Sequence, residues 1–116
     1  MAWSSVGNIK GADGSLVAVN AQTGTTYTLV LTDKGKLVEC TNASAITLTV
    51  PPNSSVAFAV GTVLYVAQGG AGQVTVAAGS GVTIKKASTL KTRAQESVLA
   101  LVKTATDTWR LMGDAA

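Results

Sequence analysis

From Thr26 onward, the sequence consists of short runs in which apolar and polar residues alternate, and glycine or proline follows most of these runs. The first run, TYTLVLTD, places Tyr27, Leu29 and Leu31 on one side of an extended chain and threonines on the other. A period of two is typical of β-strands. The turn residues DKG and the run KLVEC follow, so we expect residues 26–32 and 36–40 to form a hairpin.

Further strands are expected along the rest of the chain. AITLTV alternates in the same way and stops at Pro51 and Pro52, which cannot donate a hydrogen bond to a neighbouring strand. Residues 62–67, 73–77 and 82–86 are three more candidates, separated by the glycine-rich turns QGGAG and AGSG. Short strands at this spacing predict an all-β fold: a compact β-sandwich, small barrel or β-roll of short antiparallel strands.

The C-terminal stretch SVLALVKTATDTWRLMGD predicts a second hairpin, in which residues 97–104 pair with residues 108–112 through the turn ATD. The segment AQESVLALVKTA has the spacing of an amphipathic helix as well, because short apolar runs are ambiguous. The β-branched neighbours and the turn that follows favour a strand.

The first 25 residues differ in composition from the rest and contain four glycines without a sustained period. We expect them to form an extended N-terminal arm, with at most one short strand at residues 16–19, ahead of a β domain at residues 26–116. Trp3 is a large aromatic residue near the chain end. It either fits a pocket on a partner or folds back onto its own domain, and the sequence leaves both open.

Composition excludes several classes of protein. The nine Lys and Arg residues are scattered, and the net charge is only +3, so no nucleic-acid groove is predicted. No run approaches the roughly 20 apolar residues of a membrane span, and the N-terminus lacks a secretion signal. Because Cys40 is the only cysteine, no internal disulfide forms. We expect a protein made in the cytoplasm, without a membrane partner.

The sequence offers little for catalysis. Histidine is absent, the six acidic residues show no paired spacing, and GGAGQVTVAAGSG lacks the Gly-Lys-Ser/Thr ending of a phosphate loop. Cys40 lies in a strand pattern without a basic neighbour, which favours a buried, inert thiol over a nucleophile. These features predict a protein that is not an enzyme and binds no metal, nucleotide or organic cofactor.

Residues 26–114 resemble a β-rich structural module of tailed-bacteriophage virion proteins, found in capsid decoration, head-fibre and tail-fibre proteins. The segments that carry this resemblance are DKGKLV, NASAITLTVP, GAGQVTV followed by SGVTI, and the closing WRLMGD at residues 109–114. The resemblance implies a structural or adhesive role, typically as a homotrimer. A monomer with charged edge strands is the alternative, in which Lys34, Lys36, Lys85 and Lys86 protect the edges.

The short arm and compact β domain favour a capsid decoration or head-fibre protein over a long fibre. In this hypothesis the arm binds the outer surface of the capsid, with Trp3 and Ile9 as anchors and Lys10 near acidic residues of the shell. The expected partners are the major capsid protein and further copies of this chain, and the expected location is the virion surface. Exposed loops could also contact bacterial surface glycans.

Two other functions remain open at this stage. A tail-fibre or receptor-binding tip would need a cluster of exposed aromatic residues, and the chain has five aromatic residues in all. A glycan hydrolase would need two carboxylates facing each other across a cleft.

Overall fold

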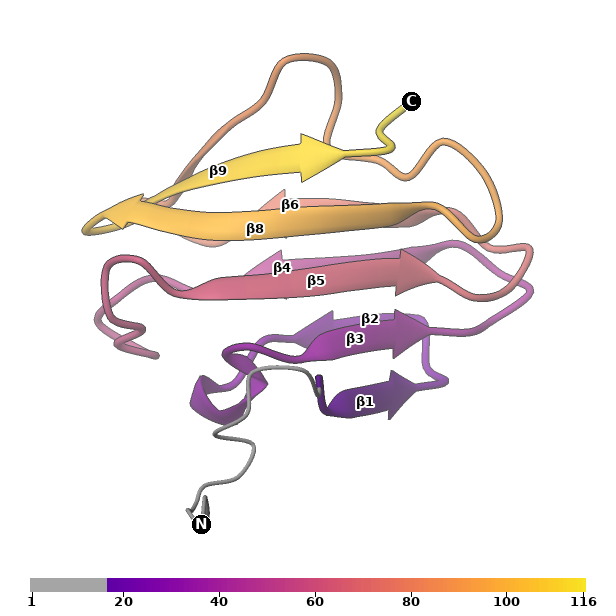
Figure 1. The fold of residues 1–116 in the computed structure, drawn as a ribbon, viewed down its shortest axis with the longest axis horizontal. Coiled ribbons are helices and arrows are strands. Elements are labelled where there is room, and N and C mark those ends of the chain that lie inside the picture. Colours follow the sequence, from indigo (N-terminus) through magenta and orange to yellow (C-terminus); the bar gives the residue numbers. More distant parts are fainter. Residues whose placement is uncertain (1–16) are drawn as a thin grey trace, which may run out of the picture.

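The computed structural model describes residues 17–116, which form two β-sheets that share one apolar core (Figure 1). Sheet A has six strands in the order β1-β3-β5-β8-β9-β7, and sheet B has three in the order β2-β4-β6. The strands of this part of the chain are β1 (Val19–Gln22), β2 (Thr26–Thr28), β3 (Leu37–Cys40), β4 (Ile46–Val50), β5 (Val63–Gln68), β6 (Val74–Ala78), β7 (Thr83–Lys85), β8 (Val98–Ala105) and β9 (Thr108–Gly113).

The first six strands wind as successive coils, each giving one strand to sheet A and the next to sheet B. β1, β3 and β5 pair in parallel, as do β2, β4 and β6. Leu37 pairs with Tyr65 and Ile46 with Val74, so both strands of the second coil recur 28 residues later (65 − 37 and 74 − 46). The fold is therefore all-β, with a β-solenoid-like arrangement.

Alternate side chains along the strands are mostly apolar and point inward, and they fill the space between the sheets. Val38 and Leu64 point inward from sheet A, Leu48 points inward from sheet B, and all three are fully buried. At one end of this core, Phe58 packs edge-to-face against Trp109 with ring centroids 5.4 Å apart. Burial of this apolar surface is the main force that holds the sheets together.

The C-terminal third departs from the coil pattern. β8 and β9 form an antiparallel hairpin that lies between β5 and β7, so β7 joins sheet A as an edge strand, parallel to β9. Figure 1 shows this hairpin beside β5, at the end of the molecule opposite β1. The turn is closed by Asp107, whose φ of 55° lies in the left-handed region that Asp tolerates.

Two glycines permit the corners of neighbouring coils to stack closely. A Cβ on Gly72 would overlap the carbonyl group of Ser44, and one on Gly70 would lie 2.8 Å from the carbonyl oxygen of Asn42. The backbone amide of Gly72 donates to the Asn42 carbonyl at 2.8 Å. The QGGAG segment predicted as a turn is thus a corner in which no side chain fits at Gly70 or Gly72.

Several sequence predictions are confirmed. Strands lie close to each of the predicted positions 62–67, 73–77 and 82–86, and β4 ends at Val50, just before the two prolines. The segment that was ambiguous between helix and strand is β8, and its hairpin with β9 forms as expected.

The predicted N-terminal hairpin is wrong. Residues 26–32 do not remain extended: β2 ends at Thr28, and the chain turns through a short 3-10 helix, η2 (Leu31–Asp33), into β3. β2 lies in sheet B and β3 in sheet A, so the two strands do not pair. The DKG segment crosses from one sheet to the other. The prediction of antiparallel strands is wrong for β1 to β4, because successive strands alternate between the sheets and each pairs in parallel with the strand two positions later.

The predicted arm does not extend to residue 25. β1, within that segment, pairs with β3 along Val19–Gln22 and forms the edge of sheet A. Residues 1–16 of the predicted arm lie outside the described residues.

Candidate binding surfaces

The outer face of sheet A is predominantly apolar. Because alternate residues of a strand point to opposite faces, the residues between the buried positions point away from the core. In register across five strands, one outward row consists of Val19, Leu37, Tyr65, Ala100 and Met112. Val63 and Val102 are paired in the next outward row. Val19 and Met112 are 61% and 45% exposed, so part of this row is in contact with solvent.

The outer face of sheet B has the opposite character. Thr26, Thr47 and Thr75 form one row across its three strands, and Thr28, Thr49 and Ala77 form the next. A face of threonines suits contact with water, since each carries a hydroxyl group beside a methyl group that fits the pleated surface. The two outer faces of this molecule therefore differ in chemistry, although both sheets pack against the same core.

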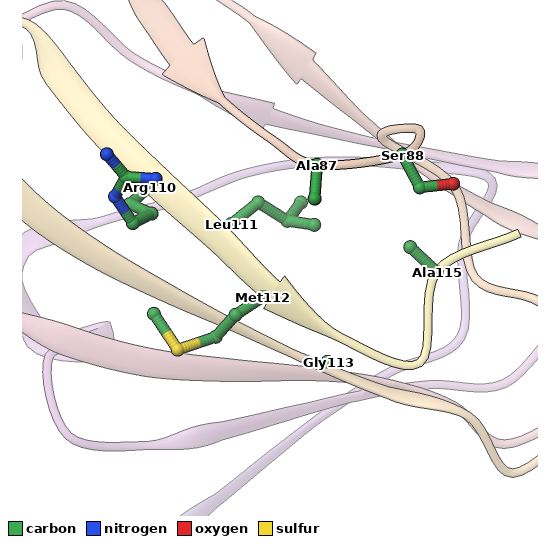
Figure 2. Close-up of a pocket in the computed structure, with 7 residues that line it drawn as sticks. All are labelled: Ala87, Ser88, Arg110, Leu111, Met112, Gly113 and Ala115. Carbon is green, nitrogen blue, oxygen red and sulfur yellow. The ribbon is translucent and has the colours of Figure 1, made fainter.

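A pocket of about 410 Å³ lies along one side of β9 (Figure 2). Arg110 is its one ionisable lining residue, and the hydroxyl of Ser88 donates to the carbonyl of Ala116. Arg110 and Met112 belong both to this pocket and to the outer face of sheet A, so the two surfaces are continuous. The lining residues are Ala87, Ser88, Arg110, Leu111, Met112, Gly113 and Ala115.

Asp33 is fully buried at the crossing between the sheets. Its carboxylate accepts hydrogen bonds from the Asn20 side chain at 2.8 Å, the Tyr27 hydroxyl at 2.7 Å and the Val30 amide at 2.9 Å. Burial and the adjacent carboxylate raise the pKa of Tyr27 to about 12. These bonds fix the turn between β2 and β3, so Asp33 has a structural role in this geometry.

Lys103 is a second buried ionisable residue, 2% exposed, on the inward side of β8. Its ammonium group donates to the Asn53 side-chain oxygen at 2.6 Å and to the Phe58 carbonyl oxygen at 2.7 Å. Asp107 accepts from the Asn53 backbone amide at 2.6 Å. The lysine thereby ties the loop after β4 to the C-terminal hairpin.

Cys40 is buried, as the sequence predicted. Burial raises the pKa of its thiol to about 11, and the negative charge of neighbouring Glu39 acts in the same direction. A protonated, inaccessible thiol is a poor nucleophile.

An exposed ion pair lies near the C-terminus. Arg93 Nε is 2.8 Å from Asp114 Oδ1, and the Ser97 hydroxyl donates to the other carboxylate oxygen. The Arg93 hydrogen bond is the main reason that the pKa of Asp114 is lowered. The pair contributes little to stability because both side chains are in water.

The proposed capsid-binding residues Trp3, Ile9 and Lys10 all lie outside the described residues. Within residues 17–116, no group of three or more His, Cys, Asp or Glu side chains is placed to hold a metal ion. That part of the chain also has no helix long and apolar enough to cross a membrane.

No family model, curated protein or solved structure matches this chain.

The apolar outer face was missed from the sequence, although a signal for it exists. The runs VLYVA in β5 and VLALV in β8 are apolar at nearly every position, whereas ITLTV in β4 alternates. A strand that is apolar on both sides is typical of a sheet covered on both faces. In this molecule the described residues cover only one face of β5 and β8.

Proposed function

We propose that this chain is a non-enzymatic structural protein of a tailed-phage virion, a homotrimeric capsid decoration protein that binds the outer capsid surface and stabilises the shell. The resemblance of residues 26–114 to phage virion modules gives the biological setting. The observation that carries the structural role is the apolar outer face of sheet A, because a large unpaired apolar surface marks a site of assembly.

The architecture supports such a role. Neighbouring coils are tied together by parallel strand pairing, and β4 and β6 also by the close backbone contacts at Gly70 and Gly72, which favours a rigid body. A rigid subunit loses little conformational entropy when it binds a shell, so more of the contact energy appears as affinity.

The arm supplies the proposed anchor, with Trp3, Ile9 and Lys10 as its contacts to the major capsid protein. A decoration protein that binds the assembled shell and not its dissociated subunits stabilises the shell by mass action. The proposal needs no cofactor, nucleic acid or membrane.

Co-sedimentation with undecorated capsids of a tailed phage tests this function. Full-length protein should pellet with capsids and saturate at a fixed stoichiometry. A truncation lacking residues 1–14 should remain in the supernatant while retaining the circular dichroism spectrum of the full-length chain. If the full-length protein fails to pellet at concentrations far above those of capsid sites, the decoration function is wrong.

A tail-fibre or receptor-binding tip is the second candidate, and the threonine face of sheet B favours it. Five threonines at regular strand spacing present hydroxyl groups that can bond to the hydroxyls of a bacterial surface glycan. Binding to host cells that is lost in Thr47→Val and kept in Val102→Thr would support this candidate. Binding equal in both variants would exclude the threonine face as the receptor site.

A further inference from the structure

Lys103 interrupts the apolar row that β8 turns toward the core. Leu99 and Leu101 occupy the preceding inward positions and are fully buried, and Lys103 itself is 2% exposed. Within residues 17–116 no carboxylate forms an ion pair with its side chain, and the ion pair present there joins Arg93 and Asp114. Lysine is a costly way to supply two hydrogen bonds to neutral oxygens, because its amine is taken out of water. A chemical role for the amine would account for this cost.

The oxygen nearest the amine belongs to a side-chain amide. Nζ of Lys103 donates to Oδ1 of Asn53 at 2.6 Å. A carbonyl bond is about 1.2 Å long, so Nζ lies within about 4 Å of Cγ, the carbon that a nucleophile attacks. Reacting atoms in a near-attack arrangement are about 3–3.5 Å apart, so the two groups are close to that separation. The amide must turn about its Cβ–Cγ bond to present Cγ to the amine, and this torsion is soft in asparagine.

The C-terminal hairpin holds both reacting groups. The backbone of Lys103 is fixed on β8: its amide donates to the Thr62 carbonyl at 2.9 Å, and its carbonyl accepts from the Gly61 amide at 2.7 Å. The Asn53 backbone amide donates at 2.6 Å to the carboxylate of Asp107, in the turn between β8 and β9. Contacts that hold both partners in place give their reaction a high effective concentration.

Two buried aromatic residues adjoin the amine. Trp109 is opposite Lys103 in the pairing of β8 with β9. Phe58 packs edge-to-face on Trp109, and its carbonyl accepts the second hydrogen bond from Nζ at 2.7 Å. Phe58 and Trp109 are 3% and 1% exposed. A site from which water is excluded protects a reaction between an amine and an amide from competing hydrolysis.

The hydrogen bonds leave the amine free to react. The ammonium group of a lysine has three protons, and the two acceptors at Lys103 are the oxygens of Asn53 and Phe58. When the third proton leaves, both hydrogen bonds can remain, and the nitrogen gains a lone pair. The two acceptors thus hold the nucleophilic form of lysine beside the amide.

We propose that Lys103 and Asn53 form an intramolecular isopeptide bond after the chain has folded. A bond forms between Nζ and Cγ, and the bond between Cγ and Nδ2 of Asn53 breaks. The lysine nitrogen gives up two protons, and the departing asparagine nitrogen takes them and leaves as an ammonium ion. No oxidant, reductant or added co-reactant is needed. The bond forms within one chain, so it is independent of capsid binding.

The bond closes a loop of residues 53–103, which includes β5, β6 and β7. A covalent link across such a loop lowers the entropy of the unfolded chain. Chains that have reacted should therefore unfold at higher urea concentrations than chains that have not, in which the two hydrogen bonds alone hold the loop.

Intact mass under denaturing conditions tests the bond. After prolonged incubation of the purified wild type at neutral pH and physiological temperature, the mass should be lower than the sequence mass by that of one ammonia molecule. Trypsin does not cleave after a lysine whose amine is in an amide, because its pocket selects a charged side chain. Digestion should therefore release a branched peptide that joins the segments around Asn53 and Lys103.

Lys103→Met and Asn53→Ala each remove one reactant and should have the masses of their own sequences. Lys86→Met, which replaces an exposed lysine outside the site, is the matched control and should still lose ammonia. The branched peptide comes from the wild type, so this evidence does not depend on the folding of either variant.

A wild type that keeps its full sequence mass would overturn the proposal. A mass deficit that persists in Lys103→Met would overturn it as well, because that ammonia would come from a cyclic imide at an asparagine.

Discussion

At the scale of single residues, each polar side chain that is buried within residues 17–116 makes at least one hydrogen bond. Asp33 accepts three hydrogen bonds and Lys103 donates two. Asp33 lies at the crossing from β2 to β3, and Lys103 lies in the C-terminal hairpin. A buried charge without such partners would be strongly destabilising. Both residues therefore fix loops that the apolar core alone would leave free.

Replacing Lys103 tests this role. Lys103→Met keeps the length of the side chain but leaves the Asn53 and Phe58 oxygens without their donor, so the free energy of unfolding should fall by about 1–3 kcal/mol. Thr104→Met, at the exposed neighbouring position of β8, is the matched control and should change it by less than about 0.5 kcal/mol. Urea unfolding measures both. A Lys103→Met variant as stable as the wild type would show that the ammonium group is dispensable.

The raised pKa of Cys40 predicts alkaline destabilisation. The native state keeps a proton that the unfolded state releases above about pH 9, so stability is full below that pH and declines as pH rises through about 11. Between pH 8.5 and 10.5 the loss should be roughly 1–2 kcal/mol.

Urea midpoints measured across this range check the prediction. The decline should be shallower in Cys40→Val, and Tyr27, with its own raised pKa, supplies the part that remains. An identical decline in the wild type and in Cys40→Val would show that the thiol is not responsible.

At the scale of elements, a strand can be predicted from the residues within it, whereas the strand that it pairs with cannot. The strands at residues 46–50 and 98–105 are predictable because alternation and the stop at Pro51 are visible within a few residues. The partner of β4 is β6, 28 residues later, and no local signal specifies that register. DKG has the composition of a hairpin turn, but the bonds to buried Asp33 direct the chain into the other sheet.

Close stacking of the coils requires glycine at the corners. Gly72→Ala would force a methyl group against the Ser44 carbonyl, so it should lower the free energy of unfolding by about 2 kcal/mol. Gly24→Ala is the matched control, since its methyl group would meet only the Thr26 carbonyl oxygen at 3.7 Å. If thermal unfolding shows equal effects for the two, close stacking at this corner does not limit stability.

At the scale of the whole molecule, the strands form a rigid stack with one face suited to water and one suited to contact. The candidate surface escaped sequence analysis because inward and outward positions of β5 and β8 are both apolar, so only the three-dimensional register separates core from exterior. In the proposed function, the arm attaches each copy to the capsid through Trp3, Ile9 and Lys10, and the apolar face of sheet A is the proposed site of assembly.

We propose that this protein reinforces a capsid, and the thermal resistance of undecorated capsids at saturating protein measures that reinforcement. The wild type and Thr47→Lys, which changes the threonine face of sheet B, should raise the temperature at which capsids release their contents. Val102→Lys, which places a charge on the apolar outer face of sheet A, should raise it less. A release temperature unchanged by saturating wild-type protein would show that the protein does not stabilise the shell.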